Sequence, residues 1–456
     1  MPAKNANIIQ QCRKHWRVKS TKMKTQLNNI KKREIFGWAM FDFANSGYTT
    51  VVLTAVFNTY FIGVIASELE NGAATFIWTF TIAFANALVL FASPLVGAIS
   101  DHSCNKKPLL LIATALCTFF TALLYFTGPG DVILASSLVI FSSFMFYIGE
   151  SLIGAFLPEI SNEKNIGKIS GYGWSLGYVG GLIVLGISLV YVNYAQSQGQ
   201  TSLQFVPVTM LIVAASFALS VIPTFVLLKE RCRTPLLPSP GKTHSLFVIG
   251  YQRLKKTWRE SHKYQDLFHF LGCLFVYHCG INTVIVIAAI YAQEVMHFST
   301  EDTIMLILIV NVSAATGAFI FGFLQDKIGV KLTLSLTLII WILAMLIAYS
   351  TTSLYWFWFV ANLIGIALGS SQSAGRAMIG LFSPIGNNGE FFGLWAVAIR
   401  LAAIVGPLTY GITAYLTQGD HRQALLSTTV FFIAGLYLLT RVDEKRGKQA
   451  AQAINR

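Results

Sequence analysis

The chain has little charge, because Asp, Glu, Lys and Arg make up only 12% of its 456 residues. A soluble domain usually carries about 25%. Hydrophobic residues make up 54%, and the mean hydropathy is +0.61. There are too few polar side chains to cover the two or three domains that a soluble protein of this length would form. The composition therefore excludes a soluble enzyme, a DNA-binding protein and a disordered scaffold.

The sequence also lacks the motifs of several kinds of chemistry. Gly241-Lys-Thr lacks the earlier glycine of a P-loop, so we do not expect an ATP-driven pump. No CxxC pair suggests zinc, and no haem or flavin motif is present, so we expect no cofactor and no bound metal. A membrane enzyme would need several His and Asp in one loop, and the pair Asp101-His102 falls short of this. We therefore assign no catalytic residues and predict that the protein is not an enzyme.

Cysteines are few, and none of the six lies in a predicted external loop. Three of them face the cytoplasm in the predicted topology, and the other three lie within spans. Disulfide frameworks form in oxidising compartments. We therefore do not expect one here.

Long apolar stretches are abundant. A membrane-crossing helix needs roughly 20 mostly apolar residues, because the hydrocarbon core is about 30 Å thick. Twelve stretches meet this requirement, at 36–64, 74–100, 108–127, 131–157, 169–193, 205–228, 266–293, 299–325, 332–351, 354–382, 391–417 and 421–440. They are too long and too uniformly apolar for barrel strands. The sequence thus predicts an all-α membrane protein.

The basic residues indicate the orientation of the chain. Of its 33 Lys and Arg, 30 lie in the tails and in the loops of one side, and the opposite side has only Arg422. Because Lys and Arg accumulate in cytoplasmic loops, we predict that both termini are cytoplasmic. This charge is tethered to a membrane surface, so the lipid bilayer is the expected partner and nucleic acid is not. We expect a monomer.

The chain divides into two halves of six spans. The predicted parts are a basic tail at 1–35, a first bundle at 36–228, a linker at 229–265, a second bundle at 266–440 and a tail at 441–456. The second span ends in Gly97-Ala-Ile-Ser-Asp101, and the eighth ends in Gly322-Phe-Leu-Gln-Asp326. Basic residues follow both. Such repeats mark secondary transporters, whose substrate site lies near mid-membrane between the halves.

These two GxxxD segments resemble the loop signature of the major facilitator superfamily. The first copy departs from it, because His102 and Asn105 stand where basic residues are usual and Cys104 where glycine is usual. Four further segments are similar to the branch that includes the autophagy-related vacuolar amino-acid effluxers and many bacterial proteins. They are Gly37–Ser46, Phe156–Ile160, Ile169–Trp174 and Glu390–Trp395.

The resemblance implies twelve helices in two six-helix bundles related by pseudo-symmetry. It also implies rocker-switch alternation between the bundles, amino-acid export, and a place in a bacterial inner membrane.

Four charged residues lie inside predicted spans: Asp42, Glu150, Arg376 and Arg400. A charge at the bilayer centre costs at least about 2.5–3.5 kcal/mol, so such residues face a cavity or pair with one another. The first half supplies two acids and the second half two arginines. We expect pairs within about 4 Å that cross between the halves when the cytoplasmic side is closed. Alternatively, each charge only supports packing within its own half.

Polar side chains at helical spacing surround these charges. The candidate substrate and coupling residues are Asp42, Asn45, Tyr147, Glu150, His278, Asn282, Gln372, Arg376 and Arg400. The candidate gating residues are Asp101, Lys106, Asp326 and Lys331. At a helix end, an acid can meet the positive N-terminus of a helix across the boundary between the halves. His278 is open to another reading, as a hydrogen-bonded core residue.

The leading hypothesis is a secondary active transporter that moves a small solute by alternating access. Protons are the simplest coupling ion, carried by Asp42 and Glu150 if burial favours their neutral forms. Amino acids lead among substrates because of the resemblance and the two arginines, and siderophores, drugs and peptides are the alternatives. A membrane sensor without transport is the alternative of another class.

Overall fold

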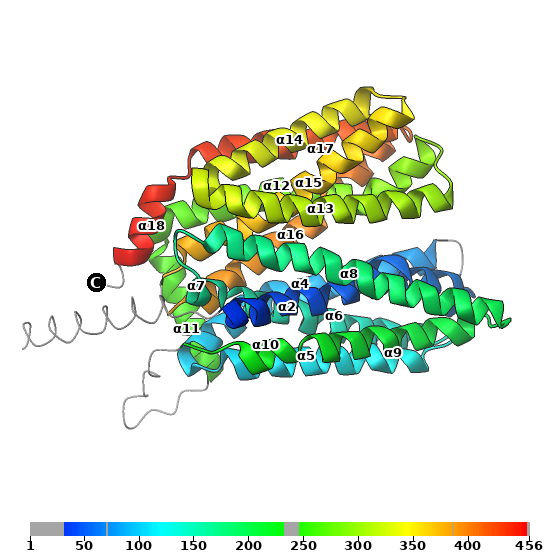
Figure 1. The fold of residues 1–456 in the computed structure, drawn as a ribbon, viewed down its shortest axis with the longest axis horizontal. Helices are drawn as coiled ribbons and strands as arrows, with labels where there is room; N and C mark the ends of the chain where they lie inside the picture. Colours follow the sequence, from blue (N-terminus) through cyan, green and yellow to red (C-terminus); the bar gives the residue numbers. More distant parts are fainter. Residues whose placement is uncertain (1–31, 70–71, 232–245, 385, 454–456) are drawn as a thin grey trace, which may run out of the picture.

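The structure is a computed structural model, and it describes residues 32–69, 72–231, 246–384 and 386–453. Within these residues, twelve helical spans are long and apolar enough to cross a membrane, as the sequence predicts. The regular structure that it describes is helical throughout (Figure 1). The chain is therefore an integral, multi-pass membrane protein of the predicted all-α class. Residues 1–31 of the predicted tail and 232–245 of the predicted linker lie outside the described residues.

The first half begins with a composite span, in which α2 (Lys32–Gly47) continues through a π-helical stretch, η1 (Tyr48–Ala55). The span ends with α3 (Phe57–Tyr60) and η2 (Phe61–Ile65). The helices that follow are α4 (Ala73–Ser103), α5 (Lys106–Leu123), η3 (Leu124–Phe126), α6 (Val132–Gly154), α7 (Leu157–Ile160), α8 (Ile166–Ser197), α9 (Ser202–Ser220) and α10 (Ile222–Leu227).

The second half follows a helix in the connecting segment, α11 (Leu246–Arg259). Its helices are η4 (Ser261–Tyr264), α12 (Gln265–Glu294), α13 (Thr300–Ile328), α14 (Val330–Ser350), α15 (Leu354–Phe382), α16 (Asn388–Leu416), α17 (His421–Thr440) and α18 (Glu444–Ala453). Figure 1 shows the first half (blue to green) below the second half (light green to red).

Several helices extend beyond the apolar stretches that mark them in the sequence. The stretch at 169–193 lies in α8, which begins at Ile166, and the stretch at 391–417 lies in α16, which begins at Asn388. Their first turns contain Gly, Lys, Asn and Glu. Hydropathy does not detect such turns, because a helix continues outside the hydrocarbon wherever its backbone groups find partners. These polar first turns are where the halves meet.

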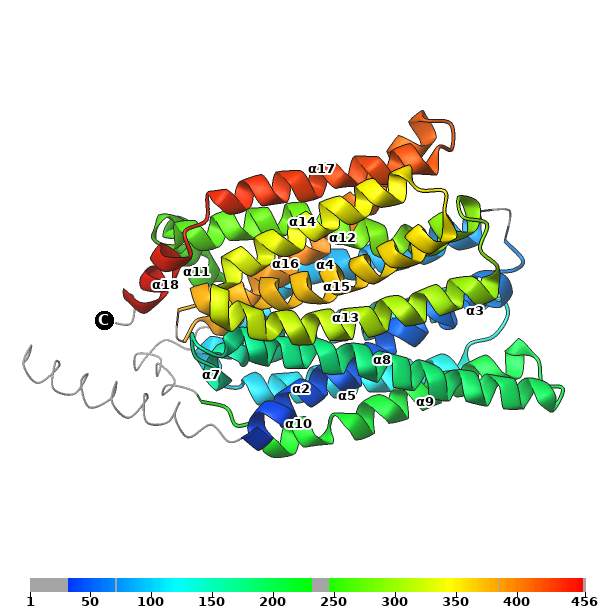
Figure 2. The same cartoon turned by 45° about the horizontal axis from the view of Figure 1, so that its top comes forward.

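We call the end of the molecule that carries the start of α2 (dark blue), α11 and α18 the linker end (Figures 1 and 2). The halves contact each other mainly through α4 against α16 and α8 against α13. Close approach depends on glycine. A Cβ atom on Gly97 of α4 would collide with the carbonyl oxygen of Gly389, and one on Gly171 of α8 would lie 2.5 Å from the carbonyl oxygen of Ala318. Both tight contacts lie in the half of the molecule nearest the linker end.

The turn after Asp101 forms even though cysteine stands where glycine is usual. Cys104 adopts the left-handed conformation with φ 57°, and Gly329, three residues after Asp326, has φ 93°.

Candidate substrate and gating site

Asp42 of α2 and Arg376 of α15 form an ion pair between the halves. The Nη1 atom of Arg376 donates to Oδ2 of Asp42 over 2.7 Å, and only 3% of the arginine side chain is exposed. The other guanidinium nitrogens bind Ser170 of α8, with Nη2 2.9 Å from its carbonyl oxygen and Nε 3.3 Å from its hydroxyl. The rings of Trp38 and Trp174 lie 4.7 and 5.2 Å from the guanidinium carbon. Arg376 is thus held on all sides.

Glu150 of α6 and Arg400 of α16 form a second ion pair between the halves. The Nη2 atom of Arg400 donates to Oε2 of Glu150 over 3.0 Å. The guanidinium lies 3.9 Å from the centre of the Tyr147 ring, a cation–π arrangement. The Nε atom of Arg400 is buried without a hydrogen-bond partner, and 13% of the side chain is exposed. The ion-pair distance is longer than in the first pair, and the arginine side chain is more exposed. One N–H donor of Arg400 remains unused.

The geometry therefore matches the expected cross-pairing of acids and arginines. The sequence left open which acid meets which arginine, and folding selects Asp42 with Arg376 and Glu150 with Arg400. The two pairs lie close enough for the charges of Asp42 and Arg376 to act on Glu150. In this structure each of the four residues pairs with a residue of the opposite half, not of its own half. Their roles in transport remain predictions.

The remaining candidate residues surround this centre unevenly. Gln372 accepts a hydrogen bond across the boundary from the hydroxyl of Tyr178. His278 is buried on α12, near enough to feel the charge of Arg400, and its carbonyl accepts from the Asn282 side chain over 3.0 Å. Asn45 is buried on α2, one turn beyond Asp42. Folding thus brings residues of α2, α6, α12, α15 and α16 to one region.

Asp101, at the end of α4, binds the first turn of α16. Its Oδ1 accepts from the amide of Gly389 over 3.0 Å, and its Oδ2 accepts from the amide of Glu390 over 2.9 Å. Lys106 lies 3.1 Å from the same carboxylate and 2.7 Å from Glu159. The predicted meeting of an acid with a helix N-terminus across the boundary is therefore present. We call this contact the first junction.

Asp326, at the end of α13, makes the equivalent contact with α8, which we call the second junction. Its Oδ1 accepts from the amide of Gly167 over 2.9 Å, and its Oδ2 accepts from the amide of Lys168 over 3.1 Å. Helix N-termini favour negative charge because their first amides lack partners within the helix. Both junctions therefore stabilise contact between the halves at the linker end.

The two lysines of the predicted gates do not cross the boundary. Lys106 binds Asp101 and Glu159 of its own half. Lys331 donates from Nζ to the carbonyl oxygens of Thr440 and Val442, which belong to its own half as well. Lys331 therefore ties α14 to the chain after α17, and the contacts that we find for it do not reach the first half.

A second pair of equivalent contacts, which the sequence did not indicate, connects the two ends of each half. Glu34 at the start of α2 binds Arg231 after α10 through two bonds of 2.7 Å. Asp266 at the start of α12 binds Arg446 after α17 through bonds of 2.6 and 2.7 Å. The amide of Arg446 donates to the exposed Asp443 and holds the pKa of that carboxyl below its usual range. Each pair joins the start of the first span of one half to the chain that follows its last span.

Other missed residues carried little signal in the sequence. Ser170, Trp174 and Tyr178 line the boundary on α8, but a serine or an aromatic residue in a span is most often a packing residue. Glu390 entered the sequence analysis only as the first residue of the family-like segment Glu390–Trp395, just before the predicted span at 391–417. It lies instead in the first turn of α16 and is completely buried.

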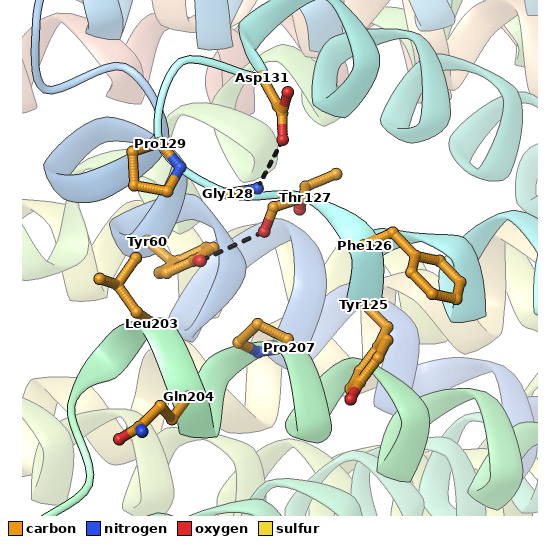
Figure 3. A pocket seen from close by; sticks show the side chains of 10 residues that line it. All are labelled: Tyr60, Tyr125, Phe126, Thr127, Gly128, Pro129, Asp131, Leu203, Gln204 and Pro207. Carbon is orange, nitrogen blue, oxygen red and sulfur yellow. Dashed lines mark hydrogen bonds between the residues drawn. The ribbon is translucent and has the colours of Figure 1, made fainter.

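A cavity of about 480 Å3 lies where the chain turns between spans of the first half, and Figure 3 shows its lining residues. Tyr60, Asp131 and Pro207 are among its lining residues. The Tyr60 hydroxyl donates to the carbonyl oxygen of Thr127 over 3.3 Å. The cavity is open at a surface turn and holds none of the buried charges, so we do not identify it with the substrate site. Among the described residues, no group of three or more His, Cys, Asp or Glu is placed to hold a metal ion.

The comparisons with known proteins agree with the architecture. The family described as "Vacuole effluxer Atg22 like" matches residues 70–452. The uncharacterized MFS-type transporter YxiO of Bacillus subtilis (strain 168) is 26% identical over 427 residues, which cover 92% of this chain and 96% of that protein. Autophagy-related protein 22 of Yarrowia lipolytica is 25% identical over 332 residues, which cover 67% of this chain but only 55% of that protein.

Solved structures show the same fold at low sequence identity. The proton:xylose symporter XylE has a TM-score of 0.71 and 14% identity, covering 93% of this chain and 99% of that one. The transporter FucP in its outward conformation has a TM-score of 0.68 and 14% identity, covering 90% and 98%. Such likeness establishes the two-bundle architecture of the major facilitator fold and nothing about the solute.

Proposed function

Since this chain belongs to the Atg22-like branch of the major facilitator superfamily and is a secondary transporter, we propose that its two halves alternate around the paired charges. The observation that carries the proposal is the two buried ion pairs between the halves. Secondary transporters of this architecture bind their substrates near mid-membrane, between repeats. The described arrangement is then the state in which the linker end is closed.

Opening of the linker end would separate α2 and α6 from α15 and α16, and with them both ion pairs. Removing one partner from a buried ion pair costs about 3–5 kcal/mol. The opening halves must therefore offer each charge a replacement, in the form of water or a charged substrate group. The pairs would belong to one state only, so a ligand that replaces an acid changes the balance between the states.

Arg400 is the arginine that a substrate carboxylate would meet first. Its side chain is more exposed than that of Arg376, at 13% against 3%, and its Nε atom has no acceptor. A planar guanidinium binds a carboxylate through two parallel hydrogen bonds. Arg400 could therefore hold a substrate carboxylate in exchange for Glu150. Amino acids are the first substrate class to test, with peptides, siderophores and drugs as alternatives.

The linker end would face the cytoplasm, because 30 of the 33 Lys and Arg lie in segments on that side. The similarity to a Bacillus transporter over 92% of the chain supports a bacterial inner membrane. Export of the solute from the cytoplasm is the direction to test first, by measuring flux in both directions. A proton gradient would supply the energy.

Flux in proteoliposomes tests the proposal. A thermal-shift screen of the purified protein against a metabolite panel first selects solutes, because a ligand that binds the native state stabilises it. The protein should then move a selected solute and concentrate it when a proton gradient is imposed. If ligands bind but no solute moves under any gradient, the protein is a sensor without transport.

Arg400→Ala should lower transport of the selected solute at least about tenfold, equivalent to about 1.4 kcal/mol, and this loss should exceed any loss of folded, membrane-inserted protein. Arg441→Ala is the matched control, because Arg441 also packs on a tyrosine, Tyr437, but lies exposed at a helix end. It should transport like the original protein. Normal transport by Arg400→Ala would remove this arginine from the mechanism.

A further inference from the structure

Glu390 is buried in a place that gives its carboxyl no partner. It lies in the first turn of α16, none of the residue is exposed, and neither carboxyl oxygen has a hydrogen-bond partner. Its backbone amide is one of the two that bind Asp101 at the first junction. The side chain is therefore sealed beside the contact that joins the halves.

Three elements enclose the Glu390 carboxyl. Asp101 of α4 adds a negative charge, and Arg253 and Lys256 of α11 add positive charges at longer range. Arg253 is already engaged, since its Nη2 donates to Asn387 over 2.8 Å. Tyr264 of η4 also faces the carboxyl.

The hydroxyl of Thr257 on α11 lies beside the carboxyl as well, without a hydrogen bond of normal geometry. Among the residues that the structure describes, no cation is in ion-pair contact with Glu390, and a second acid, Asp101, is nearby.

A buried carboxyl of this kind holds a proton rather than a charge. Burying an unpaired ion is so unfavourable that the group neutralises instead. Two acids that share one site also rarely ionise together. Asp101 has Lys106 and two amides to stabilise its charge. Of the two, Glu390 is therefore the group that is neutral while the junction is closed.

We propose that Glu390 is a proton-binding site that couples proton release to the opening of the first junction. When α16 moves away from α4, water reaches the carboxyl, the O–H bond breaks, and the proton passes to water. The carboxylate that remains lies near Arg253 and Lys256, which stabilise it in the open state. Closure then requires a proton to return.

This inference rests on the proposed alternation of the two halves, and it assigns the coupling proton to a different residue. Asp42 and Glu150 each have an arginine nitrogen within 3.0 Å in the closed state. An arginine therefore balances the charge of each of these two carboxylates. Among the described residues Glu390 has no such partner, so it needs a proton to become neutral.

Hydrogen exchange of the complete protein in lipid nanodiscs tests the proposal. The amides of Gly389 and Glu390 exchange only when they leave Asp101, so the segment 388–391 reports opening of the first junction. After correction for the intrinsic effect of pH on exchange, protection should fall as pH rises. If one proton is bound only in the closed state, the protection factor should fall by up to about tenfold for each pH unit.

Glu390→Gln keeps the shape of the side chain and removes the titration, so its protection should be high and independent of pH. Glu390→Asp keeps a carboxyl and should retain a pH dependence with a displaced midpoint, which excludes general misfolding as the cause. Lys168→Gln removes the charge at the equivalent position of α8 and should keep the original pH dependence. The proposal is overturned if the original protein shows no pH dependence, or if Glu390→Gln keeps it.

Solute flux measured on the same preparations separates the two proposals. If solute flux persists but opening of the first junction does not depend on pH, the proposed role of Glu390 is wrong and the proposed transport function stands. The reverse result, pH-dependent opening with no flux of any ligand that binds, would support Glu390 and contradict transport.

Discussion

At the first junction Asp101 accepts hydrogen bonds from the second and third residues of α16, and at the second junction Asp326 accepts the same two bonds from α8. The four distances lie between 2.9 and 3.1 Å. The repeated sequence thus builds one backbone arrangement twice. What surrounds the two aspartates differs.

The Asp101 side chain is fully buried and pairs with Lys106, whereas Asp326 is partly exposed and the structure gives it no lysine partner within the described residues. The third residue of the helix is Glu390 at the first junction and Lys168 at the second. The ammonium of Lys168 lies over the rings of Tyr172 and Phe323. The first junction is therefore a buried site with two acids that protons can control, and the second is a partly exposed contact with one acid and a basic residue beside it.

The largest effect should come from comparing Asp101→Ala with Asp326→Ala. Loss of Asp101 leaves two buried amides and part of the Lys106 charge without partners, which should destabilise the closed state by about 3 kcal/mol. Loss of Asp326 should cost about 1.5–3 kcal/mol at most, because water can reach the freed amides. Hydrogen exchange at the starts of α16 and α8 measures both. Equal effects would mean that burial does not distinguish the junctions.

The next effect concerns the glycine contact at the first junction. A Cβ on Gly97 would collide with the carbonyl of Gly389, so Gly97→Ala should hold α4 and α16 apart and raise exchange at the start of α16. Gly186→Ala in α8 is the matched control, because a Cβ there meets nothing within 4 Å. We expect the control to differ by less than about 0.5 kcal/mol. An unchanged exchange rate in Gly97→Ala would show that the helices can yield at this contact.

The smallest effect should come from Lys331→Ala. Lys331 binds the carbonyl oxygens of Thr440, the last residue of α17, and of Val442, both in its own half. Its loss should alter the opening equilibrium by less than about 1 kcal/mol, the usual value of a surface interaction. Transport by this variant, measured beside Asp326→Ala, checks the assignment. A strong transport defect in a normally folded Lys331→Ala variant would show that Lys331 does take part in gating.

Most of the architecture could be predicted from the sequence. Twelve apolar stretches correspond to twelve helical spans, because a hydrocarbon slab about 30 Å thick demands about 20 apolar residues in a row. The repeated GxxxD segments marked both junction aspartates, since a helix end is a local feature of the chain. The four charges within spans identified the residues that pair, because lipid tolerates a buried charge only with a partner.

Only the tertiary structure decided which acid meets which arginine. Asp42 and Arg376 are 334 residues apart in sequence, and the partner Ser170 comes from a third helix. No local sequence pattern predicts these contacts, because they depend on how whole helices pack against one another. The burial of Glu390 was likewise decided by α11 and η4 packing near the start of α16. The sequence determined where charges enter the membrane region, whereas the packing of distant helices determined which of them found a partner and which had to hold a proton.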